Sequence, residues 1–168
     1  MRANRVDDPL FKQSYAFSRD GQTLRIEMWT DPGGGVRAEH VHPALEERYE
    51  VLEGEITLNL DGESKRLGRG ERAVVPPGAR HSFENTGGRA AHIIAKAEPA
   101  QELRESIEEG ARLARSQRFS DSGSPRSLRA LVEAAALAKR YRETVVLTSP
   151  PRFVQRILFP PLALFARR

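Results

Sequence analysis

Short stretches with alternating apolar residues, separated by turns that contain glycine or proline, run through the first 98 residues of this 168-residue chain. In residues 23–30, for example, Leu24, Ile26 and Met28 share one side of an extended strand, because successive side chains point to opposite faces. Turn-forming pairs such as Asp61-Gly62 recur about every 8–12 residues, a spacing typical of all-β sandwiches and barrels. The sequence therefore predicts an all-β core of about eight or more short strands.

The histidines are placed where this strand pattern would bring them together. His40 and His42 are two residues apart, so an extended strand would present both imidazole rings on one face. Glu47 follows five residues later, and His81 follows a proline-rich corner. Imidazoles and a carboxylate suit a divalent first-row metal, and the chain has no cysteine to supply a thiolate.

The spacing of these residues resembles the two sequence motifs of the cupin family. The residues that match the first motif are Gly34, His40, His42, Glu47 and Gly54, and those that match the second are Gly70, Pro76, Gly78, His81 and Asn85. The resemblance covers roughly residues 23–97 and implies a small jelly-roll β-barrel that holds a metal inside one end. It does not cover the C-terminal 70 or so residues.

The resemblance implies a divalent transition metal bound by four side chains: His40, His42, Glu47 and His81. We expect Fe(II), with Mn, Ni, Zn and Cu as alternatives, and with two octahedral positions left for water or substrate. Glu46 could replace Glu47 if the loop that precedes it shifts. His92 belongs to neither motif and is expected to be structural.

The neighbours of these ligands on the same faces are apolar or aromatic. We expect the substrate pocket to be lined by four of them: Met28, Tyr49, Val51 and Phe83. Tyr49 is also the candidate catalytic proton donor, the alternative being an aromatic residue that only lines the barrel.

Cupins have many activities, so the resemblance does not select one. We expect a metal-dependent enzyme that binds a small molecule and oxidises it in a dioxygenase-like reaction, with an enolic or catecholic ligand as substrate. One alternative is a non-catalytic module that binds or senses a small molecule. Another is an isomerase or lyase that uses zinc or manganese.

The apolar period changes after residue 98. This divides the chain into a barrel with an N-terminal arm, residues 1–98, and a helical C-terminal extension, residues 99–168. The extension predicts helices over residues 101–119 and from Ser124 to about Tyr141, with Ser124 as N-cap and Pro125 at the first helical position. Residues 144–147 receive no prediction.

The extension is basic, with 13 Lys and Arg against 7 Asp and Glu, whereas residues 1–98 hold 14 against 16. We interpret this excess as a solvated, arginine-rich helical face. Residues 152–168 are largely apolar, and Pro160-Pro161 interrupts them. We expect them to pack on the barrel or across a homodimer interface, with contact to a membrane surface as the alternative.

Features that the sequence lacks bear on its expected partners and location. It has no interleaving of basic and aromatic residues and no helix-turn-helix pattern, so we expect no nucleic-acid partner. The N-terminus has no apolar core of a secretory signal, and the chain has no cysteine, so we expect a cytoplasmic protein.

Overall fold

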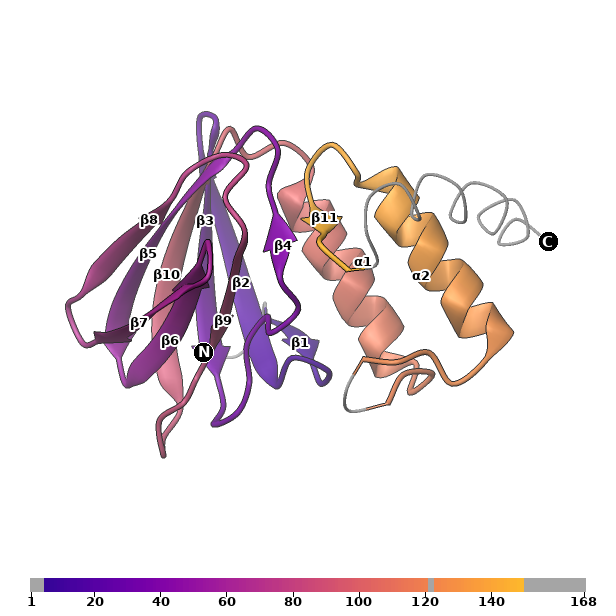
Figure 1. The fold of residues 1–168 in the computed structure, drawn as a ribbon, viewed down its shortest axis with the longest axis horizontal. Helices are drawn as coiled ribbons and strands as arrows, with labels where there is room; N and C mark the ends of the chain where they lie inside the picture. Colours follow the sequence, from indigo (N-terminus) through magenta and orange to yellow (C-terminus); the bar gives the residue numbers. More distant parts are fainter. Residues whose placement is uncertain (1–4, 121–122, 150–168) are drawn as a thin grey trace.

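The computed structural model describes residues 5–120 and 123–149 and consists of two β-sheets with two helices beside them (Figure 1). The strands are β1 (Val6–Asp8), β2 (Gln13–Asp20), β3 (Thr23–Thr30), β4 (His40–Val41), β5 (Glu46–Glu53), β6 (Glu55–Leu60), β7 (Glu63–Gly68), β8 (Arg72–Val75), β9 (His81–Glu84), β10 (Ala91–Glu98) and β11 (Val146–Leu147). The helices are α1 (Leu103–Arg115) and α2 (Leu128–Arg140). The predicted all-β core with a helical C-terminal extension is confirmed.

The two sheets share one core. One sheet has the strand order β1-β2-β3-β10-β5-β8, and the other has the order β11-β4-β9-β6-β7. All the pairings between these strands are antiparallel. Ile93 on β10 and Leu58 on β6 are almost completely buried in the same apolar cluster, although they belong to different sheets. This arrangement places β4 and β9, the strands that carry the histidines, side by side in one sheet.

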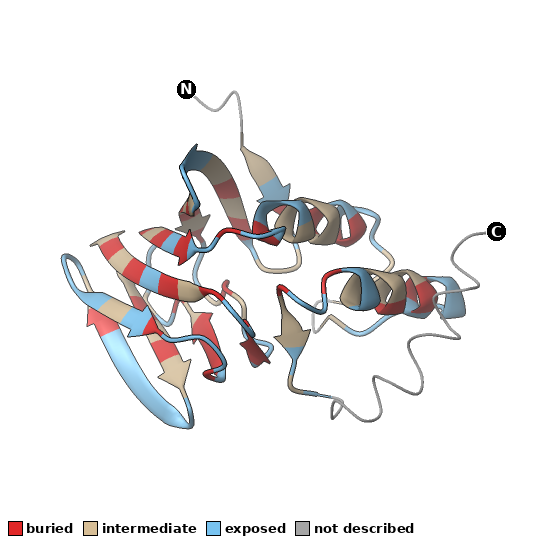
Figure 2. Cartoon of the chain, turned by 90° about the horizontal axis from the view of Figure 1, so that it is seen from above, coloured by how far each residue is buried: buried red, intermediate tan, exposed pale blue. Residues whose placement is uncertain are grey.

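The predicted alternation of buried and less buried side chains is confirmed in β3 and β5. In β3, the side chains at positions 24, 26 and 28 are buried, and their neighbours are only partly buried. In β5, Glu47, Tyr49 and Val51 are buried, whereas Arg48 is exposed. Figure 2 shows this kind of alternation as bands of different burial along the strands. A carboxylate is therefore buried inside the barrel, where an unpaired charge would be costly.

Two turns depend on glycine. The pair Asp61-Gly62 adopts φ angles of 49° and 91°, which is the left-handed geometry of a tight hairpin and confirms the predicted turn between β6 and β7. Gly35 has φ 121°, and a Cβ atom there would lie 2.5 Å from the carbonyl oxygen of Phe83. A larger residue at position 35 would push this loop away from β9, the strand that begins with His81.

The helical extension packs through α1. Helix α1 contacts β1, and α2 contacts α1. Ile107 of α1 is partly buried against the barrel core, next to the fully embedded Leu103. The apolar side chains at helical spacing, which predicted the two helices, therefore face the barrel and the other helix.

The predicted N-cap of the second helix was wrong. The cap is Ser127, whose hydroxyl oxygen accepts a hydrogen bond from the amide of Ala130 at 3.2 Å. Ser124 lies in a turn that precedes the helix, because Phe119 and Pro125 form a β-bridge and the amide of Arg126 binds the carbonyl of Arg118. This local pairing keeps the chain extended until position 127.

Residues 144–147, which received no prediction of secondary structure, end in a short strand. Residues 146–147 constitute β11, which pairs with β4 and so returns the extension to the edge of a barrel sheet. The apolar segment 152–168 lies outside the described residues. Among the helices that the structure describes, neither is long and apolar enough to cross a membrane.

Candidate metal centre

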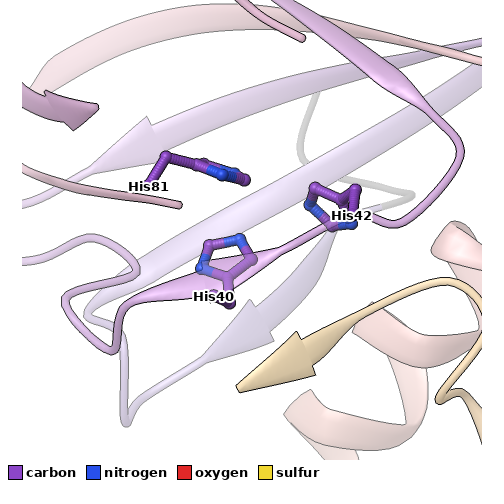
Figure 3. A group of neighbouring side chains, drawn as sticks. All are labelled: His40, His42 and His81. Carbon is purple, nitrogen blue, oxygen red and sulfur yellow. The ribbon is translucent and has the colours of Figure 1, made fainter. Parts of the chain in front are cut away.

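The imidazole rings of His40, His42 and His81 lie close together (Figure 3). His40 on β4 pairs in register with His81 on β9, and His42 follows β4 directly. One nitrogen atom from each ring forms a set in which all atoms lie within 4.8 Å of one another. The ring centroids of His40 and His81 are 4.1 Å apart, and His42 lies 5.0 and 5.2 Å from them. Three nitrogen donors at this spacing can bind one metal ion.

Each ring is oriented by a backbone carbonyl at its Nδ1 atom. His40 Nδ1 lies 3.0 Å from the oxygen of Ala38, and His81 Nδ1 lies 3.2 Å from that of Ala79. His42 Nδ1 lies 2.8 Å from a carbonyl oxygen of the extension. A carbonyl can only accept, so each Nδ1 donates its proton there, and Nε2 is the nitrogen that each ring can offer to a metal when it carries no proton.

Glu47 lies beside this set. Its Oε2 atom is 3.1 Å from Nε2 of His81 and 3.5 Å from Nε2 of His42, and it accepts a hydrogen bond of 2.9 Å from the Tyr49 hydroxyl. It is not within the 4.8 Å set, so its role as fourth ligand stays a prediction. Glu46 forms an ion pair with Arg48 on the barrel surface instead, which leaves Glu47 as the nearer carboxylate.

Comparison with known proteins identifies this barrel. A family model described as "Cupin domain" matches residues 27–95. This barrel is a cupin domain.

Two curated relatives share this part of the chain. The tetracenomycin polyketide synthase protein TcmJ of Streptomyces glaucescens is 35% identical over 68 residues, which are 40% of this chain and 45% of that protein. The polyketide synthase protein CurC of Streptomyces cyaneus is 37% identical over 57 residues, which are 34% of this chain and 37% of that protein. The matched stretch thus spans less than half of either relative.

Solved structures agree on the fold. An RmlC-like cupin from Shewanella frigidimarina has a TM-score of 0.54 at 23% identity, covering 61% of this chain and 90% of that one. KdgF from Halomonas sp. has a TM-score of 0.53 at 17% identity, covering 61% and 92%. These similarities support the cupin fold and say nothing about the extension's role.

The electrostatics of the cupin site favour a neutral His40 beside an ionised Glu47. Burial, together with the neighbouring histidines His81 and His42, lowers the pKa of His40 to about 3. Burial would raise the pKa of Glu47, but the charges and hydrogen bonds of His42 and His81 hold it well below its usual range. For His42, burial lowers the pKa, and the attraction of Glu47 outweighs it, so that the pKa is raised. A cation bound here would take over the stabilisation of Glu47 that His42 provides.

The donor set fits a first-row divalent metal. The three Nε2 atoms and one carboxylate offer borderline and hard ligands without a thiolate, a combination that suits Zn, Fe, Mn, Ni or Cu. All four side chains are at most 6% exposed, so a bound ion would be shielded from bulk water.

A cavity of about 310 Å³ opens from the histidines toward the helices. Three of the four predicted pocket residues line it, namely Met28, Tyr49 and Phe83. Val51 is fully buried in the core cluster and is not among the lining residues. The cavity wall is otherwise largely apolar.

Sequence reasoning missed the second wall of this cavity. It comes from both helices and from the segment that follows them, with Ile107, Leu113, Leu137, Tyr141, Val145 and Leu147 among the lining residues. The apolar stripe of the two helices was the available signal, but the stripe alone does not tell which part of the barrel it covers.

Proposed function

We propose that this protein is a metal-dependent enzyme that oxidises a small, largely apolar molecule through an enolic or phenolic group. The observation that carries this proposal is a cluster of three buried imidazoles, two of which, His40 and His42, line a cavity whose other lining side chains are mainly apolar. Polar groups concentrated at one point of an apolar pocket orient a ligand toward that point. A bound divalent metal would supply open coordination positions there for oxygen atoms of the substrate.

The size and lining of the cavity indicate the substrate class. About 310 Å³ accommodates a molecule of one to three fused or linked rings, in the range of typical ligand pockets. The two Streptomyces relatives are polyketide synthase proteins by name. Polyketide-type molecules combine apolar ring systems with enolic or phenolic oxygens, so we propose a ligand of this chemical class.

Tyr49 and Glu47 have a joint role in this proposal. Burial, followed by the negative charge of Glu47, raises the pKa of Tyr49 well above its usual value, so the hydroxyl keeps its proton at neutral pH. That hydroxyl donates to Oε2 of Glu47, which holds the carboxylate on the side of His81. Tyr49 therefore positions Glu47, and it offers a proton where a substrate oxygen would enter.

The proposal is tested with full-length protein loaded with Fe(II), Mn(II) or Zn(II) in separate samples. Oxygen uptake and product formation are followed with a panel of phenolic and enolic polyketide-type compounds. We expect oxygen consumption that is stoichiometric with product, seen only with a redox-active metal and lost in His40→Ala. The matched control is His92→Ala, which changes a histidine that lies on the outside of the sheet and stacks on Trp29.

Other results would overturn the oxidative proposal in distinct ways. Product formation without oxygen uptake, supported equally by zinc, would identify an isomerase or lyase. Tight binding of a compound that is recovered unchanged with every metal would identify a binding module. Failure of the native protein to bind any of these metals would remove the basis of the proposal.

A further inference from the structure

One candidate metal ligand is oriented by the helical extension and not by the barrel. His40 and His81 each contact a carbonyl two residues earlier in their own strand segments. His42 instead contacts the carbonyl oxygen of Thr144, 102 residues later in the sequence, at 2.8 Å. The family match ends at residue 95, so this contact comes from outside the matched cupin region.

The Thr144 carbonyl is held in place from its N-terminal side by the end of α2. The amides of Thr144 and Val145 both donate to the carbonyl of Tyr141, at 2.9 and 2.8 Å, and the amide of Tyr141 donates to that of Leu137. These bonds form a turn that directs the chain from the helix toward the barrel. Thr144 is 2% exposed, so no bulk water competes for its carbonyl.

The same carbonyl is held from its C-terminal side by strand pairing. Val146 and Leu147 pair with Val41 and His40, so β11 runs beside the strand that carries the histidines. The amide and the hydroxyl of Thr148 both donate to the carbonyl of Glu39 at 3.0 Å. The barrel and the extension are thus joined on both sides of the contact to His42.

We infer that residues 141–148, which we name the clamp segment, position His42 for metal binding, so that docking of the clamp segment and binding of the metal stabilise each other. This inference rests on the metal site of the proposed function. Since the Thr144 carbonyl accepts from Nδ1, it fixes the ring orientation and directs the Nε2 lone pair toward His40 and His81. Without the clamp segment, His42 could rotate or change tautomer, and the site would keep two oriented imidazoles.

The clamp segment also closes the cavity. Tyr141, Val145, Val146 and Leu147 contribute to its wall. A docked clamp segment therefore completes the ligand set and the substrate pocket together. Coupling of this kind is reciprocal. If docking of the clamp segment raises the metal affinity by a given factor, metal binding raises the equilibrium constant for docking by the same factor.

The first test uses the unmodified full-length protein and Zn(II) alone. Hydrogen exchange is compared with and without the metal, and β7 at the opposite edge of the same sheet is the internal reference. We expect amide exchange in residues 144–148 to slow by about tenfold or more, a larger change than in β7. Equal changes in both segments, with metal bound, would overturn the inference.

The second test loosens the clamp segment by Val146→Pro, which removes the amide of a β11 residue. We expect Zn(II) affinity to fall by about 10- to 100-fold, as for other partners that orient a metal-bound histidine. The absorption spectrum of the variant loaded with Co(II) should also differ from that of the Co(II)-loaded native protein. Lys139→Ala is the control, because this exposed side chain lies on the last turn of α2, just before the clamp segment.

The two proposals fail separately. If the Val146→Pro protein is folded by circular dichroism and binds Zn(II) with unchanged affinity and an unchanged Co(II) spectrum, the clamp inference is wrong while the metal site stands. If the variant does not fold, the exchange experiment on the native protein still decides. If native protein binds no metal, both the metal site and the clamp inference are wrong.

Discussion

At the scale of single residues, His81 is the candidate ligand whose removal we expect to weaken metal binding most. It is 1% exposed, and its Nε2 faces both the other histidines and Glu47. We expect His81→Ala to weaken Zn(II) binding by at least about 100-fold, beyond the 10- to 100-fold usual for an outer partner. Competition with a chromophoric chelator measures this affinity.

The control for that experiment is His92, a partly exposed histidine outside the candidate site. His92 lies 4.8 Å from Trp29 in a stacked arrangement, and its Nε2 is 2.8 Å from a carboxylate oxygen of Glu27. His92→Ala should leave zinc affinity unchanged within about twofold, because none of its described contacts involves a candidate ligand. Equal losses in both variants would argue against a site at His81.

Asp8 predicts a pH-dependent change in stability. Burial raises its pKa above the ordinary value of 3.8, although hydrogen bonds from the amides of Phe11 and Leu10 oppose this effect. An acid with a raised folded pKa stabilises the fold fully below its unfolded pKa, and this contribution is lost as the pH rises through the folded pKa.

Asp8→Asn keeps the acceptor oxygen and cannot ionise. We therefore expect the variant to have a higher unfolding midpoint than the native protein at pH 7 and a similar one near pH 3. Thermal unfolding monitored by circular dichroism across this range measures the difference. A lower midpoint at pH 7 would mean that the ionised carboxylate makes stronger hydrogen bonds than burial costs.

At the scale of elements, the stability of α2 depends on its N-cap, Ser127, the residue that precedes the helix. The Ser127 hydroxyl satisfies the Ala130 amide at the exposed start of the helix. Ser127→Ala should lower the free energy of unfolding by about 1 kcal/mol, and Ser127→Asp should restore most of it, because Asp is an equally good N-cap. Urea unfolding of the native protein and of the two variants measures the order of their free energies of unfolding.

The position of α2 links this prediction to the site. Leu137 and Tyr141 at its C-terminal end line the cavity, and the chain runs from there into the carbonyl that contacts His42. The cap at the opposite end of the helix should therefore affect stability without changing the local geometry of the metal centre. Unchanged zinc affinity in Ser127→Ala is the expected companion result.

At the scale of the whole molecule, the metal should act as a stabilising ligand. A ligand that binds only the folded state adds about 2.7 kcal/mol when its free concentration is 100 times Kd. We expect the unfolding midpoint to rise with Zn(II) concentration and to return to the starting value after addition of a chelator. Differential scanning calorimetry of native protein measures this shift, and His81→Ala should show little of it.

The sequence by itself determined the local features of the barrel. Strand periodicity is written into alternate residues, so the buried faces of β3 and β5 followed from it. The hairpin at Asp61-Gly62 followed from the left-handed conformations these residues tolerate. The three histidines could be assigned together because motif spacing encodes the cupin register, which pairs His40 with His81.

Only the tertiary structure decided how the extension relates to the site. The helical stripes predicted two helices but not the cavity they cover, because an apolar face does not specify its partner. The cap at Ser127 depended on pairing between Phe119 and Pro125, which no local preference predicts. The contact of Thr144 with His42 joins residues 102 positions apart through a backbone carbonyl. Every residue has such a carbonyl, so the sequence carries no mark of the one that orients a metal ligand.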